Sequence, residues 1–286
     1  IDNERGVIRE EWRTGSTANR RLWRDINKQK YIGTPYEKRD VIGDTAVINN
    51  FSHKALRDYY KMWYGPDLQS IVIVGDIDVD KMEKKVKDLF SPIAPRKSRG
   101  VRPHFPLPEN EKPILALCTD KEAAYSIFEL DYKRPQASDE FKLSEEGYKF
   151  NIIISLAESM MAQRFLELQL DPNSAIMQMQ AGYGNLIGVT DALQFYAVPK
   201  DGRELDACAE FTYIVEQIKR FGFNEAELEV AKRAYLNDME KSLKEKDKRE
   251  NISYAREYYR NYLDAEPIPG IEWEYKFSNA VINTLS

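Results

Sequence analysis

Apolar side chains in the first third of the chain recur mainly at helical spacing. Residues 4–30 combine good helix formers with apolar positions on one face, which predicts a helix or a pair of helices. Residues 52–64 form a second amphipathic pattern, and Ser52 is a typical N-cap for it. The β-branched run at 69–75 predicts a buried strand, and 78–90 is again helical. The expected order is helix, helix, strand, helix.

From residue 113 onward the pattern alternates between strands and helices. The predicted strands cover 114–118, 125–132, 176–182 and 192–198. The predicted helical stretches cover 138–170, 203–220 with Gly222 as its stop, 225–264, and a short last helix after Gly270. The apolar face of the helix over 203–220 is Leu205, Cys208, Phe211, Ile214, Val215 and Ile218. Turn-rich residues between the last two strands favour an antiparallel hairpin. The succession predicts an α+β fold built in layers.

Prolines mark the clearest boundary. Six prolines, counting Pro113, lie among basic residues from Ser91 to Pro113, and such a density favours an extended connector over a helix or a sheet. We therefore expect an α+β domain to end at residue 92, a linker over 93–112, and a second α+β domain over 113–286.

The sequence also resembles itself. Residues 46–52 match residues 280–286. Upstream of these two segments, residues 4–11 align with residues 227–234. Two ordered matches within a similar succession of helices indicate an internal duplication. If so, the first copy is truncated at its N-terminus and the second at its C-terminus, and we expect the chain to be a piece of a longer protein.

Composition excludes several classes of protein. The 286 residues carry 42 Lys+Arg against 47 Asp+Glu, and 42% of them are hydrophobic, which suits a globular chain with one or two cores. A mildly acidic charge gives no reason to expect nucleic acid as a partner, and no run approaches the ~20 apolar residues of a membrane span. The mixed charge run at 241–250 is interpreted as a solvated helix face. Cys118 and Cys208 are too far apart for a thiolate metal site and are expected to be small buried residues.

Glu4 and Glu11 are the strongest candidates for chemistry. Seven residues are two helical turns, so both carboxylates project from one face, where they could meet a cation or a shared substrate. By residue type alone, the plain interpretation is a pair of surface carboxylates in salt bridges.

The segment Glu4-Arg-Gly-Val-Ile-Arg-Glu-Glu11 resembles the distal-glutamate segment of the insulinase/pitrilysin family of zinc peptidases, the inverzincins, which carry an H-x-x-E-H helix. Further segments that resemble this family are 40–43, 51–52, 59–66, 71–78, 221–228 and 231–232. Each motif is loose, but their order and spacing extend over essentially the whole chain. The resemblance implies repeated two-layer α/β domains and a peptidase that hydrolyses peptides or unfolded polypeptides.

Carried over to this sequence, the resemblance implies a role for each carboxylate. Glu11 matches the third zinc ligand, which in the family joins two histidines of an H-x-x-E-H motif roughly 70 to 80 residues upstream. Glu4 matches a supporting acidic residue near the metal. The position equivalent to Glu11 in the second copy is Ala234, so the second domain is expected to be non-catalytic. The implied partners are the polypeptide substrate and the remaining domains of the same protein.

The histidines depart from the family pattern. The 286 residues contain only His53 and His104, and neither lies in an H-x-x-E-H motif. We expect Zn²⁺ in the intact protein, but neither tight zinc binding nor peptide hydrolysis by this chain alone. Two alternatives stay open: a non-catalytic scaffold or partner subunit of the same fold, and an unrelated α+β interaction domain. The compartment is unknown, with a weak lean toward the cell envelope or periplasm.

Overall fold

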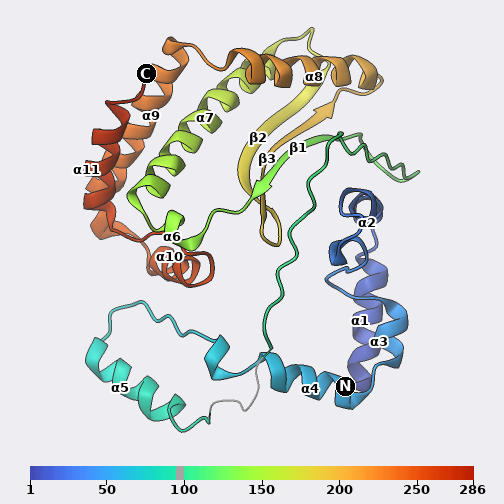
Figure 1. Cartoon of the computed structure of the whole chain (residues 1–286), viewed down its shortest axis with the longest axis vertical. Helices are drawn as coiled ribbons and strands as arrows, with labels where there is room; N and C mark the ends of the chain where they lie inside the picture. The colour runs from blue at the N-terminus through green and yellow to red at the C-terminus, as the bar shows by residue number, and fades with distance from the viewer. Residues whose placement is uncertain (95–99) are drawn as a thin grey trace. The chain divides into compact units, whose positions relative to one another are not determined.

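The computed structural model describes residues 1–94 and 100–286, and its contacts divide the chain into two compact units (Figure 1). Unit 1 comprises residues 1–70 and 79–124, and unit 2 comprises residues 71–78 and 125–286.

Unit 1 is built from helices and irregular segments in its described residues. The helices are α1 (Asp2–Thr14), α2 (Ala18–Lys30), α3 (Thr45–Asn50), α4 (His53–Trp63) and α5 (Val79–Phe90), and short 3-10 helices cover Pro35–Glu37 and Pro66–Leu68. The predicted helical region 4–30 is a pair of helices, and the hydroxyl of Thr17 caps the second by accepting from the Arg20 backbone N–H. Ser52 caps α4 as predicted, with its Oγ 3.1 Å from the backbone nitrogen of Ala55.

The strands predicted at 69–75 and 114–118 do not form. Both segments lack strand hydrogen bonding, although residues 71–74 alternate between exposed and half-buried side chains as a strand would. Ile71 and Ile73 are 49% and 45% exposed. A strand exists only through hydrogen bonds to a neighbouring strand, so the alternating pattern alone is insufficient.

The predicted linker is irregular where it is described. Residues 100–113 form neither helix nor strand, and residues 95–99 of the predicted linker lie outside the described residues. Gly100 lies against the ring of Trp63, where a Cβ would come within 2.5 Å of ring carbons. Phe105 meets Tyr36 edge to face, with ring centroids 6.4 Å apart. This part of the chain therefore packs within unit 1.

Unit 2 combines helices with a small sheet. The strands are β1 (Phe128–Pro135), β2 (Ile176–Ile187) and β3 (Thr190–Pro199), in the order β1-β3-β2 and antiparallel throughout. The helices are α6 (Asp139–Lys142), α7 (Glu145–Leu170), α8 (Glu204–Phe221), α9 (Glu225–Lys244), α10 (Asn251–Asp264) and α11 (Ile271–Ile282), with a 3-10 helix over Lys246–Lys248. The predicted hairpin is confirmed, and Gly188 supplies the positive φ, 58°, that its turn needs.

Two predicted helical stretches are interrupted. The stretch 138–170 divides into α6 and α7, because Ser144 caps α7 by accepting from the Gly147 backbone N–H at 3.1 Å. Gly147 is required there, since a Cβ would lie 2.0 Å from the carbonyl oxygen of Phe141. The stretch 225–264 likewise divides into α9 and α10.

Helix α7 lies between the sheet and the pair α9 and α11 (Figure 1). One of its faces joins the sheet and α8 in a first core, formed by Met161, Phe165, Ala175, Ile176, Met179, Phe195, Ala197, Ala207, Phe211 and Val215. Its other face joins α9 and α11 in a second core, formed by Ile152, Leu156, Met160, Ala231, Val281 and Ile282. Unit 2 is thus an α+β structure, in agreement with the predicted fold class.

The buried face of α8 agrees with the prediction in part, since the predicted Ile214 and Ile218 pack against the core. Ala207, Phe211 and Val215 are buried, whereas Leu205 is 87% exposed and Cys208 is exposed. Ala207 is fully buried in the core. Phe211 and Val215, four and eight residues further along the helix, lie on the same face and are buried too. The expectation that both cysteines are buried is therefore wrong: Cys118 is half-buried, and its Sγ lies 3.0 Å from Nε2 of Gln29.

The duplicated segments have similar packing. In unit 1, α1 packs against α3, and in unit 2, α9 packs against α11. The matched residues Ile48 and Ile282 are both buried.

In residues 1–94 and 100–286 every helix is too short or too polar to cross a lipid bilayer.

Candidate functional site

Arg5 fixes α1, the helix that carries both candidate carboxylates. Its guanidinium donates to the carbonyl oxygen of Ile48 and, at 2.7 Å, to that of Phe51, and it lies 4.0 Å from the centroid of the Phe51 ring. It also donates to Asp2 at 3.0 Å. These contacts bind α1 to the end of α3 and the start of α4.

The two ends of α1 have further contacts. His53 Nε2 lies 2.8 Å from Asp2 Oδ1, and this hydrogen bond together with the Arg5 guanidinium lowers the pKa of Asp2 to about 2. Arg24 lies 5.1 Å from the ring centroid of Trp12 and donates to Ser16 Oγ at 2.6 Å. Local charges and rings therefore hold α1 in place.

Glu4 and Glu11 are both exposed on α1, two turns apart. The neighbouring Glu10 pairs with Arg13 at 2.5 Å. Throughout residues 1–94 and 100–286, no three His, Cys, Asp or Glu side chains are close enough together to hold a metal ion. His53 contacts Asp2 instead, and His104 is exposed in an irregular segment. The donor groups of these described residues therefore do not fit a zinc ion by themselves.

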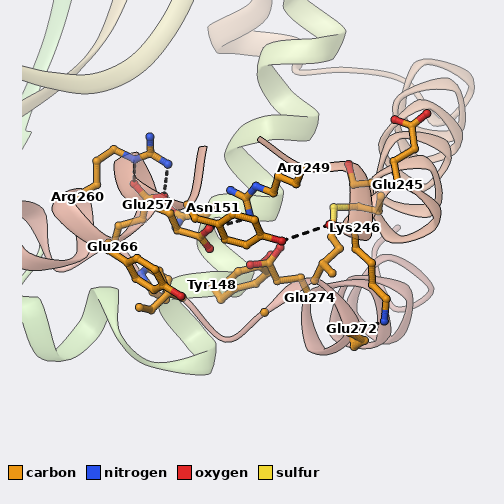
Figure 2. Close-up of a pocket in the computed structure, with 18 of the residues that line it drawn as sticks. Tyr148, Asn151, Glu245, Lys246, Arg249, Glu257, Arg260, Glu266, Glu272 and Glu274 are labelled. Carbon is orange, nitrogen blue, oxygen red and sulfur yellow. Dashed lines mark hydrogen bonds and ion pairs between the residues drawn. The ribbon is translucent and has the colours of Figure 1, made fainter. Parts of the chain in front are cut away.

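A pocket in unit 2 is a second candidate site (Figure 2). Its volume is about 1120 Å³, and its walls come from α7, α9, α10, the loops around α10 and the first turn of α11. No sequence pattern predicted this pocket, although residues 245–249, which were interpreted as part of a solvated helix face, form one of its walls. The charge run at 241–250, together with the tyrosines that follow in α10 (Asn251–Asp264), is the sequence signal that could have indicated it.

Ion pairs surround this pocket. Lys246 pairs with Glu272 at 2.5 Å, and Arg249 pairs with Glu257 at 2.8 Å. Arg260 binds Glu266 with two hydrogen bonds, one of which is 2.8 Å long. Figure 2 shows these pairs around a central Glu274 and Tyr148.

Glu274 is the half-buried carboxylate of the pocket. Burial raises its pKa, and repulsion from Glu257 and Glu266 raises it further, while the Arg249 guanidinium acts in the opposite direction. Burial, and then the nearby Glu274 charge, also raise the pKa of Tyr148. The negative form of Glu274 is thus disfavoured where it stands.

The fold is that of solved insulinase-like proteases. The crystal structure of the first half of the periplasmic protease PqqL from Escherichia coli matches 100% of this chain and 60% of that one, with a TM-score of 0.78 and 22% sequence identity. The chain belongs to the family described as the peptidase M16 inactive domain, whose pattern matches residues 50–235. The resemblance to the insulinase/pitrilysin family is confirmed.

Two curated relatives are named as zinc proteases. The probable zinc protease PqqL of Haemophilus influenzae is 40% identical over 91 residues, which are 32% of this chain and 10% of that protein. The probable zinc protease PqqL of Escherichia coli K12 is 23% identical over 286 residues, covering 97% of this chain and 30% of that protein. The chain therefore spans less than a third of the length of these relatives.

Proposed function

We propose that this chain supplies Glu11 as the third zinc ligand of an M16 peptidase and Glu4 as a supporting acidic residue. The two histidine ligands and the general base would come from an H-x-x-E-H segment elsewhere in the same protein. The observation that carries the proposal is α1 itself: two carboxylates project from one exposed face of a helix that Arg5 holds firmly. Membership of a family with zinc-protease relatives supports it.

The domain organisation belongs to the same proposal. Residues 1–92 would be the C-terminal part of the metal-site domain, 93–112 a linker, and 113–286 most of a second, non-catalytic domain. Ala234, at the position that the duplication equates with Glu11, cannot ligate a metal. The substrate would be a peptide or an unfolded polypeptide, and the periplasmic relative from Escherichia coli favours a periplasmic compartment.

The first test concerns the chain alone. We expect the purified 286-residue chain to hydrolyse no peptide and to bind no zinc tightly, because one carboxylate cannot replace a three-ligand site. Peptide hydrolysis by this chain that a chelator abolishes would contradict the proposal.

The second test uses the protein that includes the upstream segment. There, Glu11→Gln is expected to lose most of the bound zinc, measured as zinc per polypeptide, whereas Glu10→Gln on the same helix keeps it. Glu4→Gln should keep the metal and lower kcat about 10- to 100-fold, as loss of a supporting group around a metal does. Full zinc content in Glu11→Gln would exclude the assigned ligand.

A non-catalytic role is the second candidate. The matched family is described as an inactive domain, and it covers residues 50–235. If the upstream region of the coding sequence aligns with the second copy but lacks the histidines and glutamate of H-x-x-E-H, the protein is a scaffold or partner subunit of the same fold. An intact motif there supports the peptidase.

A further inference from the structure

The pocket of unit 2 is large enough to hold a small molecule or a side chain of a polypeptide. Its volume of about 1120 Å³ exceeds the roughly 300–1,000 Å³ typical of small-molecule sites. Tyrosines line it from three helices: Tyr148 on α7, Tyr235 on α9, and Tyr254 and Tyr258 on α10. None of these residues has a part in the proposed zinc ligation.

Most charges around the pocket are already neutralised. Lys246, Arg249 and Arg260 each have a carboxylate partner within hydrogen-bonding distance. Among the lining residues, six are acidic and four are basic. The pocket therefore has an excess of negative charge after the pairs are formed.

Glu274 stands apart from these pairs. Within the described part of the chain its side chain makes no hydrogen bond or ion pair, and it is half-buried beside Tyr148 (Figure 2). The carboxylates of Glu257 and Glu266 face it, and Arg249 is engaged by Glu257. A positively charged group in the pocket would relieve both the repulsion and the cost of burying the carboxylate.

The chemistry of the lining distinguishes between kinds of cation. Divalent metal ions require several ligating side chains at one point, and residues 1–94 and 100–286 offer no such cluster. An ammonium or guanidinium group needs one carboxylate and benefits from aromatic faces. Arg249, which lies 4.6 Å from the ring centroid of Tyr254, already makes such a contact in the pocket wall.

We propose that this pocket binds an alkylammonium or guanidinium group, with Glu274 as its counter-ion and the tyrosines as its walls. A lysine or arginine side chain of a polypeptide is the source we assign, and this assignment rests on the proposed peptidase function. The preference for an organic cation rests on the pocket alone.

Calorimetric titration of the 286-residue chain tests the proposal. The probes are a blocked tetrapeptide, Ala-Ala-Arg-Ala, and its twin with neutral citrulline in place of arginine. We expect the arginine peptide to bind at least about tenfold more tightly, the factor of one charge-assisted hydrogen bond. Equal binding of the two peptides, or no binding of either, would overturn the proposal.

Two variants test the assigned residues. Glu274→Gln should remove the preference for arginine, whereas Glu216→Gln, which removes a half-buried charge on α8 outside the pocket, should leave it unchanged. Tyr258→Leu should weaken arginine binding by roughly two- to fivefold and Tyr258→Phe should not, because only the ring face is used. Because Tyr258 is 44% exposed, these substitutions are compatible with folding. Undiminished binding in Glu274→Gln or in Tyr258→Leu would contradict the assignment.

Ethylguanidinium distinguishes the source of the cation. If it binds as tightly as the arginine peptide, the polypeptide assignment is wrong and the pocket recognises free organic cations. Weaker binding of the small cation supports a polypeptide. These titrations need neither zinc nor hydrolysis, so their failure leaves the zinc proposal intact, and failure of zinc ligation leaves the cation preference of the pocket intact.

Discussion

At the scale of single residues, position 147 accommodates glycine but no residue with a Cβ atom. The Cβ of an alanine would lie 2.0 Å from the Phe141 carbonyl oxygen, so the turn between α6 and α7 must open. We expect Gly147→Ala to lower the free energy of unfolding of unit 2 by about 1–3 kcal/mol or more, despite the better helix propensity of alanine. Urea unfolding followed by circular dichroism measures the change.

Gly184 provides the matched control. It lies in β2 with nothing within 4 Å of a Cβ position, so Gly184→Ala should leave stability unchanged or raise it by roughly 0.5–1 kcal/mol. Equal losses in both variants would show that the Phe141 contact is not the cause.

Glu274 predicts a pH dependence of stability. Its pKa is raised in the folded chain, so folding favours the protonated form, and stability should rise as the pH falls through the raised pKa toward the ordinary value of 4.5. Above the raised pKa the folded chain carries the full cost of the charge. We therefore expect Glu274→Gln to melt at a higher temperature than the parent at pH 8, with the difference shrinking at pH 4.

The groups that face Glu274 are Glu257, Glu266, Arg249, Tyr148 and Tyr235. A melting temperature of Glu274→Gln below that of the parent at pH 8 would mean that the carboxylate stabilises the fold.

At the scale of elements, local signals were predictable and non-local ones were not. The Ser52 cap and the turn around Gly188 depend only on residues close by in the sequence, so the local sequence was sufficient to predict them. A strand needs hydrogen bonds to a partner strand that can be remote in sequence. The local patterns at 69–75 and 114–118 therefore predicted strands that do not form. The face of α8 was predictable in part: Phe211 and Val215 are buried as expected, whereas Leu205 and Cys208 are exposed.

The candidate sites follow the same rule. The pairing of Glu4 with Glu11 on one face follows from two helical turns, and α1 has that form. The anchoring of α1 by Arg5 joins residues more than forty positions apart and left no signal in the sequence. The pocket of unit 2 combines walls from several separate segments, so no single stretch predicted it.

The junction of α7 and α9 offers a prediction at this scale. Arg164 binds Glu227 with two hydrogen bonds and donates to the Gly222 carbonyl oxygen at 2.9 Å, with both charged side chains less than a quarter exposed. We expect Arg164→Ala to lower the free energy of unfolding by about 1.5–3 kcal/mol, the usual range for hydrogen bonds to charged groups.

Arg220 is the control for this prediction. Its pair with Glu216 on α8 is exposed, so Arg220→Ala should change stability by less than about 0.5 kcal/mol. Chemical denaturation of both variants measures the free energy of unfolding. Similar losses in the two variants would show that the part-buried Arg164 pair stabilises the fold no more than an exposed pair does.

At the scale of the whole molecule, the two units differ in their cores. In its described residues unit 1 buries only the apolar side chains of Tyr31 and Ile48, whereas unit 2 contains both core clusters. We expect two thermal transitions, with unit 1 unfolding first. Hydrogen exchange should find α1 to α5 exchanging early while α7 and β3 stay protected, and simultaneous exchange would contradict this order.

Residues 71–78 give the chain an interleaved path. They cluster with unit 2, where Gly75 lies close to Asn251, yet the segments on both sides of them belong to unit 1. No single cut can therefore separate the two units intact. A fragment that starts at residue 125 lacks part of its own unit, and the missing piece would have to be returned as a separate peptide. Separation of the two units therefore takes three cuts and gives four pieces, 1–70, 71–78, 79–124 and 125–286, of which each unit needs two.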